Sequence, residues 1–306
     1  MKIRVLGSAA GGGFPQWNCN CRNCLGWRRG TLRAKPRTQS SIAVAADDAA
    51  AWALVNASPD ILAQLRAHPV LQPARAVRDT AIAAVVLVDA QIDHTAGLYM
   101  LRESSRPLPI WCTDSVHADL TGGNPIFTVL GSYCGVARRR IDSDGADFSV
   151  EGLPDLRWCA LAVPGKAAPY SPHRNAPVRG ANVALMVSDA ASGGTLVYAP
   201  GLGAMEPAVW ELLQTADCVL IDGTFWSDDE MIAQGVSAKR ARDLGHLPLS
   251  GEGGMLEWLA KLPRATRRIL IHVNNTNPIL DEDSAERAAL GRAGVEVAHD
   301  GLEISL

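Results

Sequence analysis

The chain has 306 residues, of which 47% are hydrophobic and 20% are charged, and its formal net charge is −3 at pH 7. This composition is typical of globular proteins and excludes an extended disordered chain. Tight basic clusters, such as Arg28-Arg29 and 138–140, are short, too short to follow a nucleic-acid backbone. Because large α/β domains reach this length, we expect one domain over residues 1–306.

The sequence predicts a cytoplasmic protein. No apolar stretch reaches the roughly 18 residues that suggest a membrane span, and the charged residues among the first seven positions do not fit a signal peptide. In a reducing compartment the seven cysteines are expected to be thiols or metal ligands rather than disulfides. Four of them are expected to be inert core thiols: Cys112, Cys134, Cys159 and Cys218.

Short apolar runs predict strands, and segments with helical spacing lie between several of them. The predicted strands are 3–6, 41–45, 52–56, 82–88, 183–187, 196–199, 218–222, 269–273 and 295–298. The predicted helices are 60–67, 96–103, 207–214, 254–262 and 284–293. This interleaving predicts an α/β fold in which strand ends and loops carry the chemistry. Segment 165–180, with three prolines, is expected to be a long functional loop.

The glycine-rich segment 7–13 follows the first predicted strand and superficially suggests a nucleotide-binding loop. It lacks the Gly-Lys-Ser/Thr of a P-loop, and Pro15 stands where a Rossmann helix would begin. The sequence therefore argues against nucleotide binding.

Cys19, Cys21 and Cys24 lie within six residues of each other. Cysteines this close are poorly placed to form a disulfide, whereas their thiolates can converge on a tetrahedral Zn²⁺ ion. A structural zinc is therefore expected, with a chance group of buried thiols as the alternative. A closed site needs a fourth ligand, and His299, which follows the last predicted strand, offers one unless it is an ordinary turn histidine.

Two predicted strands are followed by polar loops that contain a histidine at or near the strand end. The strand 82–88 runs into Asp93-His94, and the strand 269–273 ends in His272. Two imidazoles and one carboxylate are therefore expected to meet at the mouth of the fold. Each also has a structural explanation, since Asp93 could cap the following helix and His272 could lie in the core.

Four further residues are assigned to the surroundings of this site. His246 is interpreted as an acid–base or substrate-binding group, with an exposed loop histidine as the alternative. Asp222, at the end of a predicted strand, is expected to contact the metal ligands without binding the metal itself, with a purely structural aspartate as the alternative. Asn274 and Asn275 are expected to orient ligands or contact substrate, although asparagines also serve simply to turn a chain.

These features together resemble a known family. A strand followed by Asp93-His94 and Gly97-Leu98, with a late strand-borne His272, resembles the metallo-β-lactamase fold, and the glycine turn with its cysteines is similar to the phosphodiesterase-like branch. Almost the whole chain resembles the pyrroloquinoline quinone (PQQ) biosynthesis protein B family, and the motifs that carry this resemblance are 7–19, 37–41, 56–60, 222–224, 245–248 and 272–278. The resemblance implies a four-layer αββα sandwich and His299 as the fourth zinc ligand.

One departure from the parent fold changes the expected chemistry. Hydrolytic members carry His-x-His-x-Asp-His, but Asp89 and Gln91 occupy the first two histidine positions here, so a two-zinc hydrolase centre is not expected. Asp93, His94 and His272 then form a two-histidine, one-carboxylate face, which is typical of non-haem Fe(II) oxygenases. Fe²⁺ is therefore the expected active-site ion. Asp89 and Gln91 are interpreted as weak ligands or as hydrogen-bond partners that orient an imidazole.

The resemblance implies a role in PQQ synthesis. The leading hypothesis is that iron held by Asp93, His94 and His272 uses O₂ to hydroxylate the tyrosine ring of a peptide-derived Glu-Tyr precursor. The expected partners are this precursor or PQQ and other proteins of the PQQ pathway. One alternative is a non-catalytic carrier that assists movement of PQQ or its precursor toward the periplasm. A metal-dependent phosphodiesterase is a third possibility, least favoured because two histidines are missing.

Overall fold

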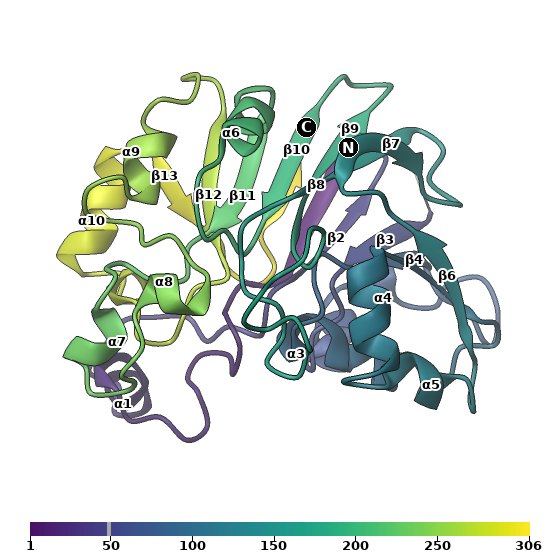
Figure 1. Ribbon diagram of the computed structural model, residues 1–306, viewed down its shortest axis with the longest axis horizontal. Coiled ribbons are helices and arrows are strands. Elements are labelled where there is room, and N and C mark those ends of the chain that lie inside the picture. Colours follow the sequence, from purple (N-terminus) through teal and green to yellow (C-terminus); the bar gives the residue numbers. More distant parts are fainter. Residues whose placement is uncertain (48–49) are drawn as a thin grey trace.

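The computed structural model describes residues 1–47 and 50–306, which form two seven-stranded sheets packed face to face with helices on their outer sides (Figure 1). In spatial order, the first sheet consists of β14 (Glu303–Ser305), β1 (Lys2–Gly7), β2 (Ser41–Ala45), β3 (Trp52–Val55), β4 (Ile82–Val86), β5 (Leu108–Cys112) and β6 (Val136–Arg140). The second consists of β13 (Val295–Val297), β12 (Arg267–Ile271), β11 (Cys218–Asp222), β10 (Thr195–Ala199), β9 (Val183–Asp189), β8 (Leu156–Ala162) and β7 (Asp144–Ser149).

The helices are short. They are α1 (Arg22–Arg28), α2 (Ile61–Ala67), α3 (Ile92–Thr95), α4 (Asp114–Thr121), α5 (Ile126–Leu130), α6 (Pro207–Gln214), α7 (Glu230–Ala233), α8 (Ala241–Leu244), α9 (Met255–Leu259) and α10 (Ala285–Arg292). Three 3₁₀ helices join them: η1 (Pro69–Leu71), η2 (Ala96–Leu101) and η3 (Pro278–Leu280). Within the described residues, no helix has the length and apolar character needed to cross a membrane.

Three hydrophobic clusters separate four layers. The central cluster joins the facing sides of the sheets and includes Ile42 of β2 and Trp158 of β8. A second packs the outer face of the first sheet against α2, α4, α5 and η2. A third packs the outer face of the second sheet against α6, α9 and α10. The predicted αββα sandwich is confirmed.

Strand direction determines where the chemistry lies. Strands β3 to β6 run parallel to one another, as do strands β10 to β13. Parallel strands end at the same edge of a sheet, where ligands commonly bind. The segments that follow β4, β11 and β12 therefore emerge along one edge of the sandwich, close to α3 and α8 in Figure 1.

All nine predicted strands are present, but five strands were not predicted, namely β5, β6, β7, β8 and β14. Three of these, β6, β7 and β14, are edge strands of the sheets, and β6 and β7 have the polar sequences VARRR and DGADFS. The predicted helix 96–103 is the 3₁₀ helix η2 instead of an α-helix. The predicted loop 165–180 contains no helix or strand and lies between β8 and β9.

Candidate metal centres

The ends of three strands supply the main group of polar side chains. β4 leads to Asp89 and, through α3, to Asp93 and His94, whereas β11 ends in Asp222. His272 follows β12 directly and has a φ of 61°, a conformation that is costly for a residue with a Cβ. Such strain persists where the surrounding structure fixes the residue, and it is frequent at functional sites.

Asp93, His94 and His272 converge, as the sequence predicted. Their ligand atoms all lie within 4.8 Å of one another. The Nε2 atom of His272 is 3.2 Å from Oδ2 of Asp93, and Nε2 of His94 is 3.9 Å from the same oxygen. The two imidazoles are buried, with 2% and 6% of their surface exposed.

The other nitrogen of each imidazole is occupied. His94 Nδ1 lies 2.8 Å from Oδ1 of Asp89, and His272 Nδ1 lies 2.8 Å from the Thr224 hydroxyl. Within the described part of the chain, Nε2 of His94 is buried and has no hydrogen-bond partner. This pattern is expected of metal-binding histidines, whose second nitrogen donates to a carboxylate or another acceptor. The group therefore fits a metal ion.

The electrostatics of the group also favour a cation. Burial opposes the ionisation of Asp93, but the nearby imidazoles outweigh it and hold the pKa of this carboxyl well below its ordinary value. Burial likewise disfavours a charged His94, but Asp89 and Asp93 raise its pKa to about 9. A metal ion takes the place of such a proton, because it requires the unprotonated imidazole.

A second group shares His272. Asp222, His246 and His272 also bring their ligand atoms within 4.8 Å of one another. His246 Nδ1 is 2.7 Å from Oδ2 of Asp222, which is fully buried, and the rings of His246 and His272 are stacked with centroids 5.4 Å apart. Burial lowers the pKa of His246, but the charge of Asp222 prevails and raises it.

The Thr224 hydroxyl connects the two groups. It donates to Oδ1 of Asp222 over 2.6 Å, and its single proton leaves it to act as the acceptor toward Nδ1 of His272. His272 therefore carries a proton on Nδ1, which leaves Nε2 as the atom that points toward Asp93 and toward the position where a metal ion would bind. Thr224 fixes the tautomer of His272, and the sequence motif 222–224 indicated no separate role for it.

A cavity of about 320 Å³ opens onto these residues. Its lining includes Asp93, all three histidines of the two groups, and Gln91, Lys166, Arg174 and Asn274. Gln91 donates through Nε2 to the carbonyl of Lys166 over 3.0 Å, so it holds a loop and does not orient an imidazole. A larger cavity, of about 840 Å³, lies beside α2 and residues 73–80 and contains none of the candidate ligands.

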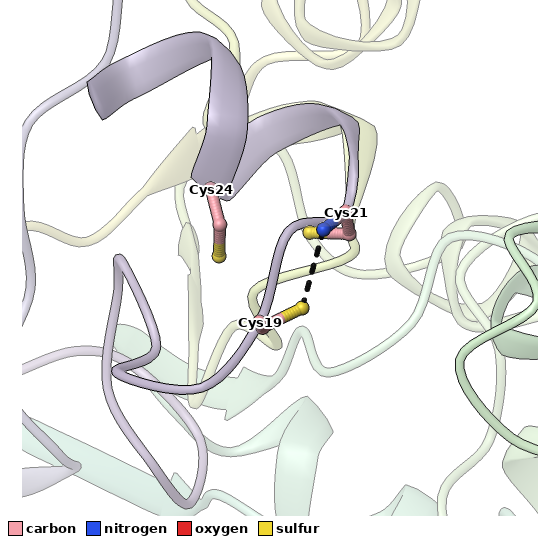
Figure 2. Close-up of side chains that lie close together, drawn as sticks. All are labelled: Cys19, Cys21 and Cys24. Atoms are coloured by element: carbon pink, nitrogen blue, oxygen red, sulfur yellow. Dashed lines mark hydrogen bonds between the residues drawn. The ribbon is translucent and has the colours of Figure 1, made fainter. Parts of the chain in front are cut away.

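The cysteines form a separate group at the start of α1 (Figure 2). The sulfur atoms of Cys19, Cys21 and Cys24 lie within 4.8 Å of one another, and the amide of Cys21 donates to the sulfur of Cys19 over 3.4 Å. A hydrogen bond from the Cys21 thiol lowers the pKa of Cys24 to about 7 despite its burial. Thiolate character at neutral pH is what a zinc ligand requires.

Asn275, and not His299, completes the surroundings of this group. The carboxamide Nδ2 of Asn275 lies 3.2 Å from the sulfur of Cys19 and 3.5 Å from those of Cys21 and Cys24. Zn–S and Zn–O bonds of about 2.3 and 2.1 Å give a tetrahedral S···O edge of roughly 3.5 Å. Amide oxygen and nitrogen are assigned from their surroundings, and a half-turn of the amide would place Oδ1 at this position instead of Nδ2.

The structure does not bring His299, the expected fourth ligand, to the cysteines. Its Nδ1 lies 2.9 Å from the carbonyl of Asp300, and among the described residues the metal-ligating group contains only the three cysteines. The segment around His299 folds back onto β1, where Gly301 donates to the carbonyl of Val5. The cysteines instead pack against the loop after β12, where Asn23 donates to the carbonyl of Asn275.

Comparisons with known proteins agree with this architecture. The sequence profile of the Beta-lactamase superfamily domain matches residues 51–273. Coenzyme PQQ synthesis protein B of Azoarcus sp. (strain BH72) is 62% identical over 306 residues, and that of Methylobacillus flagellatus is 56% identical over 307 residues, with 100% of both chains covered in each case. The chain belongs to the coenzyme PQQ synthesis protein B family. The predicted family is thus confirmed.

Solved structures give the same result. The Zn(2+)-bound PqqB of Methylobacterium extorquens matches with a TM-score of 0.90 and 37% identity, covering 100% of both chains. A diphosphatase from the PhnP family matches with a TM-score of 0.67 and 16% identity, covering 100% of this chain and 97% of the other. The second likeness concerns the fold alone. It confirms the metallo-β-lactamase fold that the sequence predicted.

Proposed function

We propose that the protein acts in PQQ synthesis as an iron- and O₂-dependent oxygenase that hydroxylates the tyrosine ring of a precursor derived from a Glu-Tyr unit. One observation carries the proposal. The Nε2 atoms of His94 and His272 and a carboxylate oxygen of Asp93 converge beside a cavity, and two histidines with one carboxylate are typical of non-haem Fe(II) oxygenases. The names of the full-length relatives support the pathway.

Three residues would hold the iron, and two others would hold the imidazoles. Asp89 fixes the ring of His94, and Thr224 fixes the ring of His272. When bound, Fe²⁺ supplies the activation of O₂ that organic side chains lack. The protein contributes by binding the substrate, orienting its ring and excluding water from the cavity.

His246 is assigned a proton-transfer role. Its Nδ1–H donates to Asp222, so in the neutral ring Nε2 carries the lone pair that can accept the phenolic proton of a tyrosine in the cavity. The reaction balances with an external reductant. One oxygen atom of O₂ enters a ring C–H bond and the other leaves as water, which requires two electrons and two protons.

The direct test uses protein loaded with Fe²⁺ under anaerobic conditions. A Glu-Tyr peptide, ascorbate as reductant and then O₂ are added, and the peptide mass is followed. We expect the gain of one oxygen atom in the tyrosine ring, abolished by Asp93→Ala and unchanged by Glu211→Ala, an exposed position on α6. An unaltered peptide mass with fully loaded iron would contradict the proposal.

A carrier of PQQ or its precursor is the second candidate, because the cavity holds basic side chains that suit an acid whether or not chemistry follows. The carrier hypothesis predicts that PQQ binds tightly and that Asp93→Ala and His272→Ala leave its Kd unchanged. Phosphodiesterase activity is less favoured. The residues at the two missing histidine positions are engaged by other groups. Both carboxylate oxygens of Asp89 lie within 2.9 Å of Nδ1 of His94, and Nε2 of Gln91 donates to the carbonyl of Lys166.

We also propose that Zn²⁺ is held by Cys19, Cys21 and Cys24 with Oδ1 of Asn275 as the fourth ligand. The three sulfur atoms lie within 4.8 Å of one another and the amide of Asn275 lies 3.2 to 3.5 Å from each, so the four side chains can converge on one tetrahedral ion. A site with four protein ligands has no open position, so this ion would be structural. It would tie the start of α1 to the loop that carries His272.

A further inference from the structure

Two basic side chains line the cavity that contains Asp93, His94 and His272. Lys166 and Arg174 are both half-buried there. Within the described residues, no carboxylate oxygen lies within 4.0 Å of either cationic group. Asp89 and Asp93, which share the cavity, are engaged by His94 and His272. Two basic residues without a carboxylate partner among the described residues therefore line the cavity that contains the metal group.

The lysine is held in place by its backbone and its stem. The carbonyl of Lys166 accepts from Nε2 of Gln91 over 3.0 Å. Its β and γ carbons pack against Gly245, where an added Cβ would lie 3.3 and 3.0 Å from them. Because Gly245 precedes His246, the aliphatic stem of Lys166 lies beside the histidine end of the cavity.

Arg174 is held by a turn of the 165–180 loop that hydrogen bonds fix in place. The amide of Arg174 donates to the carbonyl of Ser171, whose hydroxyl donates to the buried carboxylate of Asp119 over 2.7 Å. Nη1 of Arg174 also donates to the carbonyl of Ala167. This bond uses one donor of a planar group that has five, so the remaining N–H groups stay available at a defined position.

We infer that Lys166 and Arg174 form a carboxylate-binding subsite that anchors an acidic substrate while its ring reaches the metal group. The inference rests on the proposed function, because a precursor made from glutamate and tyrosine carries several carboxylates. Arg binds a carboxylate through paired N–H donors, whereas Lys acts as a point charge. Because Lys166 and Arg174 lie on one loop that hydrogen bonds hold in place, together they would fix both the position and the orientation of a ligand with two carboxylates.

Binding measured without oxygen tests the subsite. Lys166→Met and Arg174→Met keep the aliphatic stems and remove the charges. The probes are PQQ and the Glu-Tyr dipeptide, titrated calorimetrically into anaerobic, metal-loaded protein. We expect Kd to rise about tenfold for each variant and further for the double variant, because hydrogen bonds to charged groups are stronger than neutral ones. Lys239→Met, at an exposed position, is the matched control and should leave Kd unchanged.

A ligand without carboxylates identifies the interacting group. The Glu-Tyr dipeptide with its carboxyl groups converted to amides should bind weakly and equally to wild type and variants. The subsite is overturned if each ligand, PQQ or the free-acid dipeptide, binds the variants with the same Kd as wild type. Metal content and circular dichroism must be unchanged in that comparison. Charge-dependent binding without hydroxylation would contradict only the proposed function. Hydroxylation by the variants with the KM of wild type would contradict only the subsite.

Discussion

Asn275 is the residue whose role changes most once the chain is folded. Its carboxamide lies 3.2 to 3.5 Å from three sulfur atoms, and its backbone carbonyl accepts from Asn23. A side chain held this firmly against three thiols is placed to complete a zinc site. His299, the expected fourth ligand, contacts its own neighbour instead.

Zinc retention distinguishes the two residues. We expect Asn275→Ala to release zinc to a chelator at least tenfold faster than wild type, because one ligand of four is lost. Asn275→His should retain the ion, since imidazole is a good zinc ligand. His299→Ala is the control and should behave as wild type. Rapid zinc loss from His299→Ala with none from Asn275→Ala would refute this ligand set.

Glu230 gives a pH dependence that does not involve a metal ligand. Its side chain is 5% exposed and accepts hydrogen bonds from Thr276 and from the amide of Trp226. Burial raises its pKa from 4.5 to about 7. The folded protein thus binds this proton more tightly than the unfolded chain, so the stabilisation is complete below about pH 4.5 and is lost as the pH rises through 7.

We therefore expect Glu230→Gln to remove a decline in stability between pH 5 and pH 8. The free energy of unfolding of wild type, relative to that of the variant, should fall by up to about 3 kcal/mol over this interval. Urea unfolding at several pH values measures it, with the exposed Glu211→Gln as control. Parallel pH profiles for wild type and Glu230→Gln would disprove the assignment.

At the scale of elements, η2 is packed unusually close to the loop after β3. Gly97 donates to the carbonyl of Ala57, and the amide of Ala57 donates to the carbonyl of His94. A Cβ at position 97 would lie 2.1 Å from the carbonyl oxygen of Ser58. Glycine is required here because backbone approaches backbone, and this contact holds α3 and its metal-group residues against the sheet.

Gly97→Ala is expected to destabilise the protein by about 1–3 kcal/mol and to lower metal occupancy of the Asp93 group, because the backbone must shift. Thermal unfolding and metal analysis of the same samples test both effects. Gly291→Ala in α10 is the control, since no heavy atom lies within 4 Å of an added Cβ there. It should be neutral or stabilising by up to about 1 kcal/mol. Equal stability of the two variants would contradict the packing argument.

At the scale of the whole molecule, the ends of the chain lie in the same sheet. β1 pairs antiparallel with β14, so the first and last strands are neighbours. The central cluster draws on strands of both sheets and therefore joins the two halves of the chain. On this basis we propose that residues 1–306 form one domain.

A single domain predicts a single cooperative unfolding transition. Scanning calorimetry of the metal-loaded protein should give one peak, with equal calorimetric and van't Hoff enthalpies. Circular dichroism and tryptophan fluorescence should report the same midpoint. Two resolved transitions, or different midpoints for the two probes, would show that the sheets unfold separately.

Local patterns in the sequence were sufficient for several conclusions. A strand buried on both faces reads as a continuous apolar run, as in β11, and such strands were all predicted. The spacing of Cys19, Cys21 and Cys24 identified one group because its members are neighbours in the chain. The polar edge strands β6 and β7 escaped prediction because pairing with β5 and β8, and not their own composition, makes them strands.

Contacts between distant residues were decided only by the tertiary structure. Sequence placed Asp93, His94 and His272 at strand ends, but the order and direction of the strands bring residues 179 positions apart to within 3.2 Å. The same holds for Asn275 in place of His299 at the cysteines. Sequence determines which chemical groups each loop offers, whereas the packing of the two sheets determines which groups meet.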